Sequence, residues 1–305
     1  MTEENYELVI IGGGPAGLTA GLYAARAGLK SLLIERGAFG GQILNAPLVE
    51  NYPGFPEGVP GMELGALMHK QAAKYGLETL VADVGGLKAG KTHRLTAGGR
   101  SLAAQAVIIA TGSEYSRLGV PGEGKLVGHG VSYCATCDGF FFRSKEVAVV
   151  GGGDAAITDA LELAQHSSQV YVIHRRDQLR AGQVLQERAK AQPKIEFIWD
   201  TIVEAIEGGE AVRALKLRNV KTQKTSTLEV AGVFVAVGLT PNSQPFAKIV
   251  RLTESGHIVT DETMATSVPG LFAAGDVRRS SARQVASAVG DGATAAKSAF
   301  NYIKG

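Results

Sequence analysis

Short apolar runs that end at glycine-rich turns are the main hydrophobic pattern of this chain. The first run, Tyr6–Ile11, predicts a buried parallel strand, and it leads directly into the GGGPAG segment Gly12–Gly17. A helix is expected after this turn, continuing through Ala25 and ending near Gly28, because glycine is common just past helix ends. A second strand, Ser31–Ile34, follows. The order strand, turn, helix, strand predicts a parallel α/β unit.

The same pattern returns when the sequence is shifted by 139 positions. The shift places Gly12, Gly14 and Gly17 on Gly151, Gly153 and Ala156. The strand before the motif then becomes Glu146–Val150, and the two units also end alike, because Ala106–Ser113 resembles Gly232–Leu239. The repeat predicts two nucleotide-binding units of duplicated architecture.

The C-terminal part of the chain, beyond Pro241–Asn242, repeats nothing in the second unit. A short apolar strand within Ser267–Asp276 ends in Gly-Asp, and a Gly- and Ala-rich helix is expected from Arg283 toward Tyr302. We therefore assign this part to the first unit. The predicted fold class is α/β, with two Rossmann-like nucleotide-binding domains, the second inserted in the first. The first domain would comprise residues 1–116 and 244–305, and the second residues 117–243.

The first glycine-rich turn matches G-x-G-x-x-G, which binds a dinucleotide pyrophosphate when a strand precedes it and a helix follows. Gly12 permits the tight turn, Gly14 lets a pyrophosphate approach the backbone, and Gly17 lets the helix pack closely on the strand. Pro15 suits the first turn of a helix, whose free N–H groups attract phosphate. Glu35 is placed to bond a ribose hydroxyl. A tight turn that binds no phosphate is the alternative, and the complete order of elements argues against it.

The second unit differs from the first at the ribose position. The shift carries Glu35 to His174, which opens the basic segment His174–Arg180. Its guanidinium groups, Arg175, Arg176 and Arg180, could bind a ribose 2′-phosphate by paired hydrogen bonds. This difference favours NADPH over NADH. The alternative is a solvated basic helix face, as charge runs usually are.

Length, charge and termini narrow the classes of function. At 305 residues the chain has room for about two domains, and its net charge of +2 argues against nucleic-acid binding. The segment Met1–Asn5 is acidic and polar, unlike a signal peptide, and no apolar run approaches the length of a membrane span. We therefore expect a cytoplasmic protein with no nucleic-acid or membrane partner. In that compartment a Cys-x-x-Cys pair is more often catalytic than structural.

The two cysteines of the chain form such a pair, and an acidic residue follows it. Cys134 and Cys137 can cycle between dithiol and disulfide, and Asp138 could relay a proton. A structural disulfide across so short a loop would stabilise the fold little. A zinc site would need two more ligands, and the six histidines show no paired metal-ligand spacing, so no metal is expected. Two inert core thiols remain a further alternative.

These motifs together resemble the low-molecular-weight bacterial thioredoxin reductases over essentially the full length of the chain. The matching segments are Gly12–Gly17, Gly41–Gln42, Glu50–Gly54, Ala110–Ser113, Cys134–Gly139, Gly151–Ala156, His174–Ala181, Gly275–Asp276 and Arg283–Gln284. The sequence departs from the family at Thr158 and Asp159, where many relatives carry two glutamates. The resemblance implies FAD in the first unit, NADPH in the second, a homodimer, and thioredoxin or a thioredoxin-like protein as partner.

The resemblance also implies roles for individual residues. Cys137 would lie nearest the flavin, Cys134 would attack thioredoxin, and Asp138 would donate a proton. The residues expected to bind FAD are Gly12, Gly14, Pro15, Ala16, Glu35, Arg36, Gly41, Gln42, Asn51, Val84, Thr111, Gly112, Asp276, Arg283, Gln284 and Val285. Those expected to bind NADPH are Gly153, Asp154, Ala155, His174, Arg175, Arg176, Arg180 and Gly238.

The implied activity passes electrons from NADPH through FAD and the Cys134–Cys137 disulfide to oxidised thioredoxin. Because no other cysteine exists, one pair must meet both the flavin and a protein disulfide. We therefore expect the inserted domain to rotate, with hinges near Ser116–Gly119 and Thr240–Ser243. Alternatives are a flavoprotein of the same fold with another electron partner, such as a ferredoxin-dependent reductase or a dithiol oxidase, and a redox sensor that does not turn over. The arginine cluster disfavours the first two.

Overall fold

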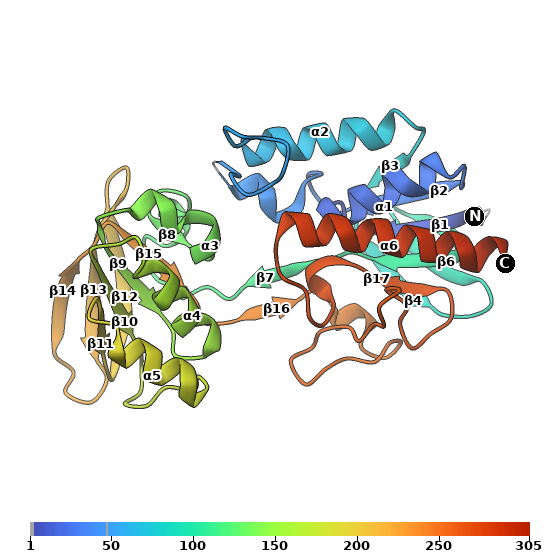
Figure 1. The fold of residues 1–305 in the computed structure, drawn as a ribbon. Coiled ribbons are helices and arrows are strands. Elements are labelled where there is room, and N and C mark those ends of the chain that lie inside the picture. Colours follow the sequence, from blue (N-terminus) through green and yellow to red (C-terminus); the bar gives the residue numbers. More distant parts are fainter. Residues whose placement is uncertain (1–2, 47) are drawn as a thin grey trace. The chain divides into compact units, whose positions relative to one another are not determined.

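The computed structural model describes residues 3–46 and 48–305, so Met1 and Thr2 of the polar N-terminal segment lie outside the described residues. The chain forms two compact units, one of residues 1–114 and 240–305 and the other of residues 115–239. Two short paired strands, β7 (Ser113–Tyr115) and β16 (Leu239–Pro241), carry the chain across (Figure 1). The units divide a few residues before the boundaries predicted at 116 and 243, because the division falls within these paired strands.

The first unit is built on a seven-stranded sheet. Its strands are β1 (Glu4–Ile11), β2 (Ser31–Glu35), β3 (Glu78–Val81), β4 (Val84–Lys88), β5 (His93–Ala97), β6 (Arg100–Ile109) and β17 (Leu271–Ala273). They run in the order β3-β2-β1-β6-β5-β4, and β17 also pairs with β6. The helices are α1 (Pro15–Arg26), α2 (Gly61–Ala73) and α6 (Val285–Lys304), with short 3-10 turns η1 (Gly41–Asn45), η4 (Gln244–Phe246) and η5 (Gly275–Val277).

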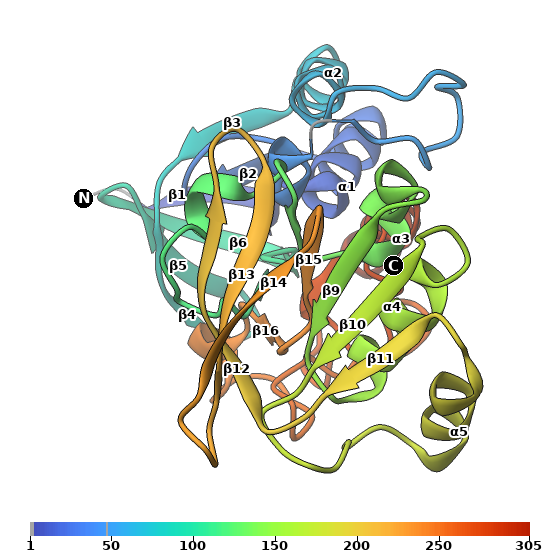
Figure 2. The ribbon, with the colours of Figure 1, turned by 90° about the vertical axis from the view of Figure 1, so that its left-hand side faces the viewer.

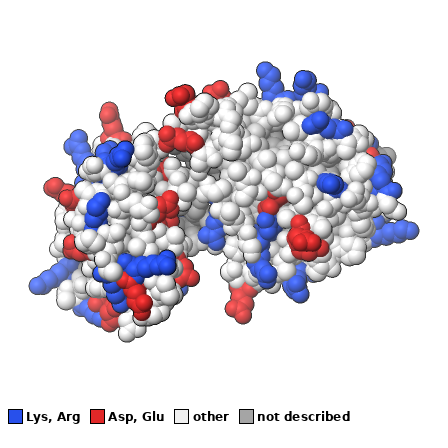
Figure 3. All heavy atoms as spheres, viewed as in Figure 1, with Lys and Arg blue, Asp and Glu red and all other residues white. Residues whose placement is uncertain are grey.

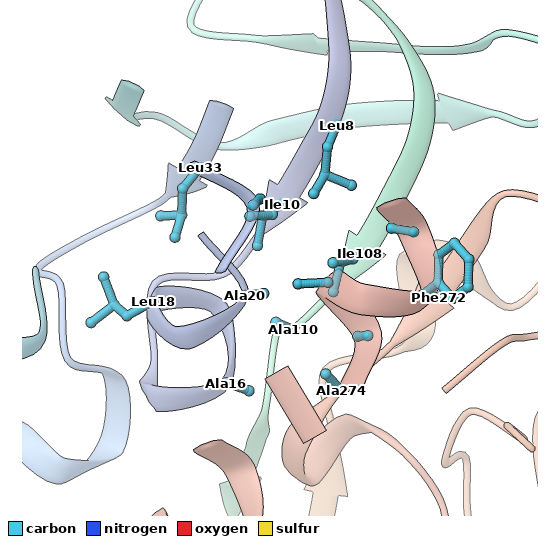
Figure 4. Packing of buried hydrophobic residues seen from close by; sticks show 14 of the residues in the cluster. Leu8, Ile10, Ala16, Leu18, Ala20, Leu33, Ile108, Ala110, Phe272 and Ala274 are labelled. Carbon is cyan, nitrogen blue, oxygen red and sulfur yellow. The ribbon is translucent and has the colours of Figure 1, made fainter. Parts of the chain in front are cut away.

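Strand β1 lies inside this sheet, between β2 and β6, and its residues Leu8–Ile11 are buried on both faces. Leu8 and Ile10 pack with residues of α1 and α6 (Figure 4), whereas Val9 and Ile11 belong to the apolar cluster on the opposite face. Helix α6 lies close against α1, because a Cβ atom at Gly292 would overlap the α1 backbone. The small residues of the predicted C-terminal helix therefore serve this close approach.

The second unit is a five-stranded parallel sheet between two unlike layers. Its strands are β8 (Val131–Ser132), β9 (Glu146–Val150), β10 (Gln169–Ile173), β11 (Ile195–Ile198) and β15 (Gly232–Val235), in the order β11-β10-β9-β15-β8. One layer holds α3 (Ala135–Asp138), α4 (Asp154–Leu163), α5 (Gln183–Ala191) and the 3-10 turn η3 (Gly139–Phe142), whereas the 3-10 turn η2 (Gly124–Leu126) packs on the opposite side of the sheet. The other is an antiparallel sheet of β12 (Thr201–Gly208), β13 (Val212–Asn219) and β14 (Thr225–Glu229). Figure 2 shows α4 and α5 on one side of the parallel sheet and β12–β14 on the other.

Both glycine-rich turns lie where the strand order reverses. β1 stands between β2 and β6, and β9 stands between β10 and β15, with parallel pairing on each side. Ligands of doubly wound α/β sheets bind at such points, beyond the carboxyl ends of the strands. The predicted fold class, α/β with two Rossmann-like domains, is confirmed. The antiparallel strands β4, β5 and β12–β14 are additions that the sequence pattern did not predict.

The surface shown in Figure 3 carries Lys and Arg interspersed with Asp and Glu. In the part of the chain that the structure describes, no helix combines the length and apolarity needed to cross a membrane.

Candidate dithiol and nucleotide sites

The first glycine-rich turn is shaped so that its backbone stays open. Gly12 has a φ of +109°, and a Cβ atom there would overlap the carbonyl group of Ala110. A Cβ atom at Gly17 would overlap the carbonyl oxygen of Gly12, so α1 can pack on β1 only with glycine at this position. Around Gly14, the first neighbour that an added Cβ atom would meet is the Cα atom of Gly41, at 3.9 Å. The bare backbone before α1 therefore leaves room for a pyrophosphate.

Glu35 ends β2 beside this turn, as the sequence predicted. Its Oε2 accepts a hydrogen bond of 2.6 Å from the N–H of Gly13, and its Oε1 accepts one of 2.9 Å from the N–H of Gly37. These bonds hold the carboxylate at the edge of the turn. Arg36 instead pairs with Glu114 across 2.6 Å.

Asp276 lies in η5, directly after β17. Its Oδ1 accepts a hydrogen bond of 2.6 Å from the Ser281 hydroxyl. Burial raises the pKa of the Asp276 carboxyl, which the Ser281 bond and the charge of Arg283 partly oppose. Helix α6 supports the turn through Asp291, which accepts hydrogen bonds from the Gly275 N–H at 3.0 Å and the Arg278 guanidinium at 2.6 Å. This ion pair is not predictable from the sequence, because nothing in the local pattern links α6 to the turn.

Loops that are far apart in the sequence meet in this unit. The Asn51 amide donates to the Gln284 side-chain oxygen at 3.0 Å, beside Val285 at the start of α6. The Gln42 amide donates to the Ser113 carbonyl oxygen at 3.4 Å.

Other predicted residues lie on different elements. Thr111, which precedes Gly112, donates to the Asn242 carbonyl oxygen at 2.8 Å. Val84 of β4 packs with the apolar cluster on the face of the sheet opposite α1 and α6.

Cys134 and Cys137 form a disulfide, with Cα atoms 5.3 Å apart. Cys134 is half-buried and Cys137 is exposed. The N–H of Cys137 points at the Cys134 sulfur across 3.2 Å. Thr136, between the cysteines, donates to Glu162 of α4 at 2.9 Å, so the short helix α3 is tied to α4.

The acid after the second cysteine is held by a serine that the sequence analysis missed. The buried Ser132 donates to Asp138 Oδ2 at 2.6 Å, and its oxygen lies 3.1 Å from the Cys134 amide nitrogen. Burial raises the pKa of Asp138, whereas the Ser132 hydrogen bond lowers it. Asp138 can therefore hold a proton more readily than an exposed carboxylate does. The two residues are six positions apart, and only the fold brings them together.

A buried carboxylate links the dithiol loop to the crossing from the first unit. Glu123 accepts hydrogen bonds from the N–H groups of Leu118 at 2.9 Å and Gly119 at 2.7 Å, and from the Tyr133 hydroxyl at 2.9 Å. Burial and Glu123 raise the pKa of Tyr133 to about 12. Leu118 and Gly119, which belong to the predicted hinge, are thus bound into the second unit.

The second glycine-rich turn repeats the first. A Cβ atom at Gly151 would press on the carbonyl group of Ala236, just as one at Gly12 would on Ala110. Gly153 has open space where a Cβ atom would lie. The Asp154 carboxylate accepts the Gly182 N–H at 2.7 Å and so closes the following loop over the start of α4.

Three of the predicted basic residues line one pocket of about 370 Å³. Its walls are Arg175, Arg176, Asp177, Gln178, Leu179, Arg180, Asp200, Val220 and Lys221. The N–H of Arg180 donates to the Gly152 carbonyl oxygen at 2.7 Å, so the basic loop folds back onto the glycine-rich turn. These residues form bends rather than the helix face that was the alternative. The three arginines therefore line one pocket that follows the second strand of the unit, where a ribose would lie.

His174 packs beneath the second glycine-rich turn. Its ring is buried against Gly152, and it does not line the pocket. Burial lowers the pKa of His174, and the charges of the neighbouring arginines add to this effect. The His174 ring therefore supports the glycine-rich turn of the predicted NADPH site. Gly238 follows β15 and lies beside Ser116.

Comparisons with known proteins place this geometry among flavin-dependent disulfide reductases. Residues 6–292 match the pyridine nucleotide-disulphide oxidoreductase family. A thioredoxin reductase of Listeria innocua is 46% identical over 99% of this chain and 95% of that protein.

Two solved structures are also similar. The thioredoxin reductase of Streptococcus pyogenes is 44% identical over 99% of both chains, with a TM-score of 0.94. The Lactococcus lactis thioredoxin reductase, described as its FR conformation, is 42% identical over 98% of this chain and 99% of that chain, with a TM-score of 0.67.

Proposed function

The chain belongs to the pyridine nucleotide-disulphide oxidoreductases, among the thioredoxin reductases, and we propose that it transfers electrons from NADPH to the disulfide of a thioredoxin. Its cofactors are FAD and NADPH. The observation that carries this function is one unit that holds both the Cys134–Cys137 disulfide and the arginine pocket beside a dinucleotide turn.

The residues of the first unit suit FAD. The open backbone at Gly14 would receive the pyrophosphate, Glu35 would bond the adenosine ribose, and Asp276 would bond the ribityl chain. When bound, FAD accepts a hydride from NADPH and passes the electron pair to a disulfide. In the second unit Gly153 would receive the NADPH pyrophosphate, and the arginines the 2′-phosphate.

The two cysteines and Asp138 have different roles in the reduction of thioredoxin. Reduction of the Cys134–Cys137 disulfide takes two electrons and one proton to give a Cys134 thiolate and a Cys137 thiol, and Asp138 would supply this proton. The Cys137 N–H directed at the Cys134 sulfur favours a thiolate there, which is the form that attacks a disulfide. The Cys134 thiolate then attacks the thioredoxin disulfide and forms a mixed disulfide with it. Cys137 attacks the Cys134 sulfur of this mixed disulfide and releases reduced thioredoxin, which restores the enzyme disulfide.

Rotation of the second unit follows from the single dithiol. Because Glu123 binds Leu118 and Gly119 into that unit, we place the bending at residues 113–116 and 238–241, in and beside β7 and β16. The two solved relatives support this proposal. Their sequence identities to this chain are 44% and 42%, yet their TM-scores are 0.94 and 0.67. Such a difference is expected if family members adopt more than one arrangement of their units.

The proposed function is tested by anaerobic addition of NADPH, and in parallel NADH, to the purified flavoprotein. NADPH is expected to bleach the flavin absorbance rapidly and NADH slowly, and oxidised thioredoxin should then restore the colour. If neither nucleotide bleached the flavin, NADPH would be excluded as electron donor. A ferredoxin-dependent reductase or a dithiol oxidase of the same fold would replace this function.

Ser132→Ala tests the proton-donating role of Asp138. Loss of the hydroxyl removes a hydrogen bond that favours the ionised carboxylate, so the pKa of Asp138 rises further. Because the protonated acid is the active form, the alkaline limb of the pH profile for thioredoxin reduction should move to higher pH. Stopped-flow measurement of flavin recovery across pH gives this profile.

Ser167→Ala is the matched control for this change, since Ser167 is a buried serine of the same unit that bonds the Phe142 carbonyl oxygen. It should leave the profile in place. An unchanged profile in Ser132→Ala as well would remove the link between Ser132 and the proton transfer.

We also propose a cytoplasmic homodimer. Three large apolar side chains on α1 and α2 of the first unit, Tyr23, Met62 and Leu67, are exposed and suit a partner surface. Sedimentation equilibrium of the purified protein would reveal a monomer if this proposal were wrong.

A further inference from the structure

A lysine from a distant hairpin completes the arginine pocket. Lys221 lies in the turn between β13 and β14, and its Nζ is 2.9 Å from Asp177 Oδ2 and 3.0 Å from Asp200 Oδ2. Asp177 belongs to the basic loop itself, between Arg176 and Arg180. The lysine thus joins the β13–β14 hairpin to the loop that carries the arginines.

The hairpin turn holds Lys221 firmly against the pocket. Asn219 Oδ1 accepts hydrogen bonds from the N–H of Lys221 at 3.0 Å and from that of Thr222 at 2.9 Å. The N–H of Val220 donates to the Asp200 carbonyl oxygen at 2.6 Å. This side chain-to-backbone bonding is typical of an ordered turn, so the ammonium group starts from a fixed base.

The charges of the pocket explain what the lysine does there. Four basic side chains and two carboxylates line it, so the excess of positive charge falls by half without Lys221. The Lys221 ammonium lowers the pKa of Asp177, so this carboxylate is ionised at neutral pH and would repel a phosphate. A ribose phosphate carries up to two negative charges at neutral pH. Its electrostatic energy with each nearby charge is therefore up to twice that of a singly charged group.

On the basis of the proposed NADPH-dependent function, we propose that Lys221 is a specificity-determining residue of this pocket. It neutralises Asp177 and Asp200 and thereby lets the arginines accept a nucleotide 2′-phosphate. An exposed ion pair of this kind contributes little to folding stability. The effect of removing Lys221 should therefore appear in anion binding rather than in unfolding.

Isothermal titration calorimetry on the FAD-loaded protein tests the proposal, with adenosine 2′,5′-bisphosphate and 5′-AMP as probes at one ionic strength. Lys221→Gln should weaken binding of the bisphosphate by about tenfold and leave 5′-AMP nearly unchanged, because only the former has a 2′-phosphate. Lys221→Arg should restore most of the affinity. Lys216→Gln is the matched control. Lys216 lies on β13, pairs with Glu207 of β12 and does not line the pocket.

Asp177→Asn gives the converse result. Removing the carboxylate should strengthen bisphosphate binding, and in this background Lys221→Gln should cost less than in the wild type, which a double-mutant cycle measures. Equal losses for both probes in Lys221→Gln, or no loss, would overturn the proposal.

Arg176→Ala shows whether a negative result concerns only the role of Lys221 or the proposed NADPH-dependent function itself. If Arg176→Ala abolishes the preference for the bisphosphate and Lys221→Gln does not change it, only the role of Lys221 is wrong. If neither variant changes the preference, the pocket is not the 2′-phosphate site.

Discussion

Cys134→Ser should lower thioredoxin reduction by roughly three orders of magnitude or more, while NADPH still bleaches the flavin at nearly the wild-type rate. Serine cannot take part in thiol–disulfide exchange, so electrons that reach the flavin have no route to a protein disulfide. The nucleotide turn and the arginine pocket lie on other elements and keep their geometry. Stopped-flow spectroscopy measures the two half-reactions separately.

Cys137→Ser is the informative comparison for this prediction. It should also stop turnover, but it keeps the attacking thiol and lacks the resolving one. Incubation with oxidised thioredoxin should therefore trap a mixed disulfide with Cys137→Ser and none with Cys134→Ser, as non-reducing electrophoresis shows. The reverse pattern would exchange the two roles, and full turnover by Cys134→Ser would refute the dithiol mechanism.

Replacing Arg175, Arg176 and Arg180 together with alanine should lower kcat/KM for NADPH by roughly 100- to 1000-fold and change that for NADH by less than about threefold. The three guanidinium groups line one pocket beyond β10, and only NADPH carries a phosphate for them to bind. Steady-state kinetics with both nucleotides measures this ratio.

Arg188→Ala controls for the loss of positive charge from the second unit. Arg188 lies in the last turn of α5 and does not line the pocket, so its removal should leave the preference for NADPH intact. Equal losses for NADPH and NADH in the triple variant would contradict the assignment of the pocket.

The elements that sequence reasoning predicted well are those with strong local signals. Strand β9 occupies Glu146–Val150 as expected, and α1 begins at Pro15 and ends within two residues of the predicted end. The fold class is confirmed because it rests on apolar runs and glycine positions, and the family is confirmed because its motifs, among them Cys134–Gly139, are local segments of the sequence. Strand β12 was missed because it carries charged residues and a register shift after Val203 interrupts the alternation of buried and exposed positions.

By itself, the sequence determined which chemical groups this protein carries and which turns hold them. The glycine positions dictate two turns with bare backbone. At some of these positions glycine is required, because a Cβ atom would overlap neighbouring backbone atoms. Two cysteines with an adjacent acid dictate a dithiol, and a basic segment replaces the acid of the first unit.

Only the tertiary structure decided which of these groups act together. It buried His174 against a glycine-rich turn, hydrogen-bonded Ser132 to Asp138, and brought Lys221 to Asp177. Each of these contacts joins different elements, whose meeting depends on packing and strand order rather than on local preference. Periodicity is a local property of a chain, whereas the distance between two side chains is set by the whole fold.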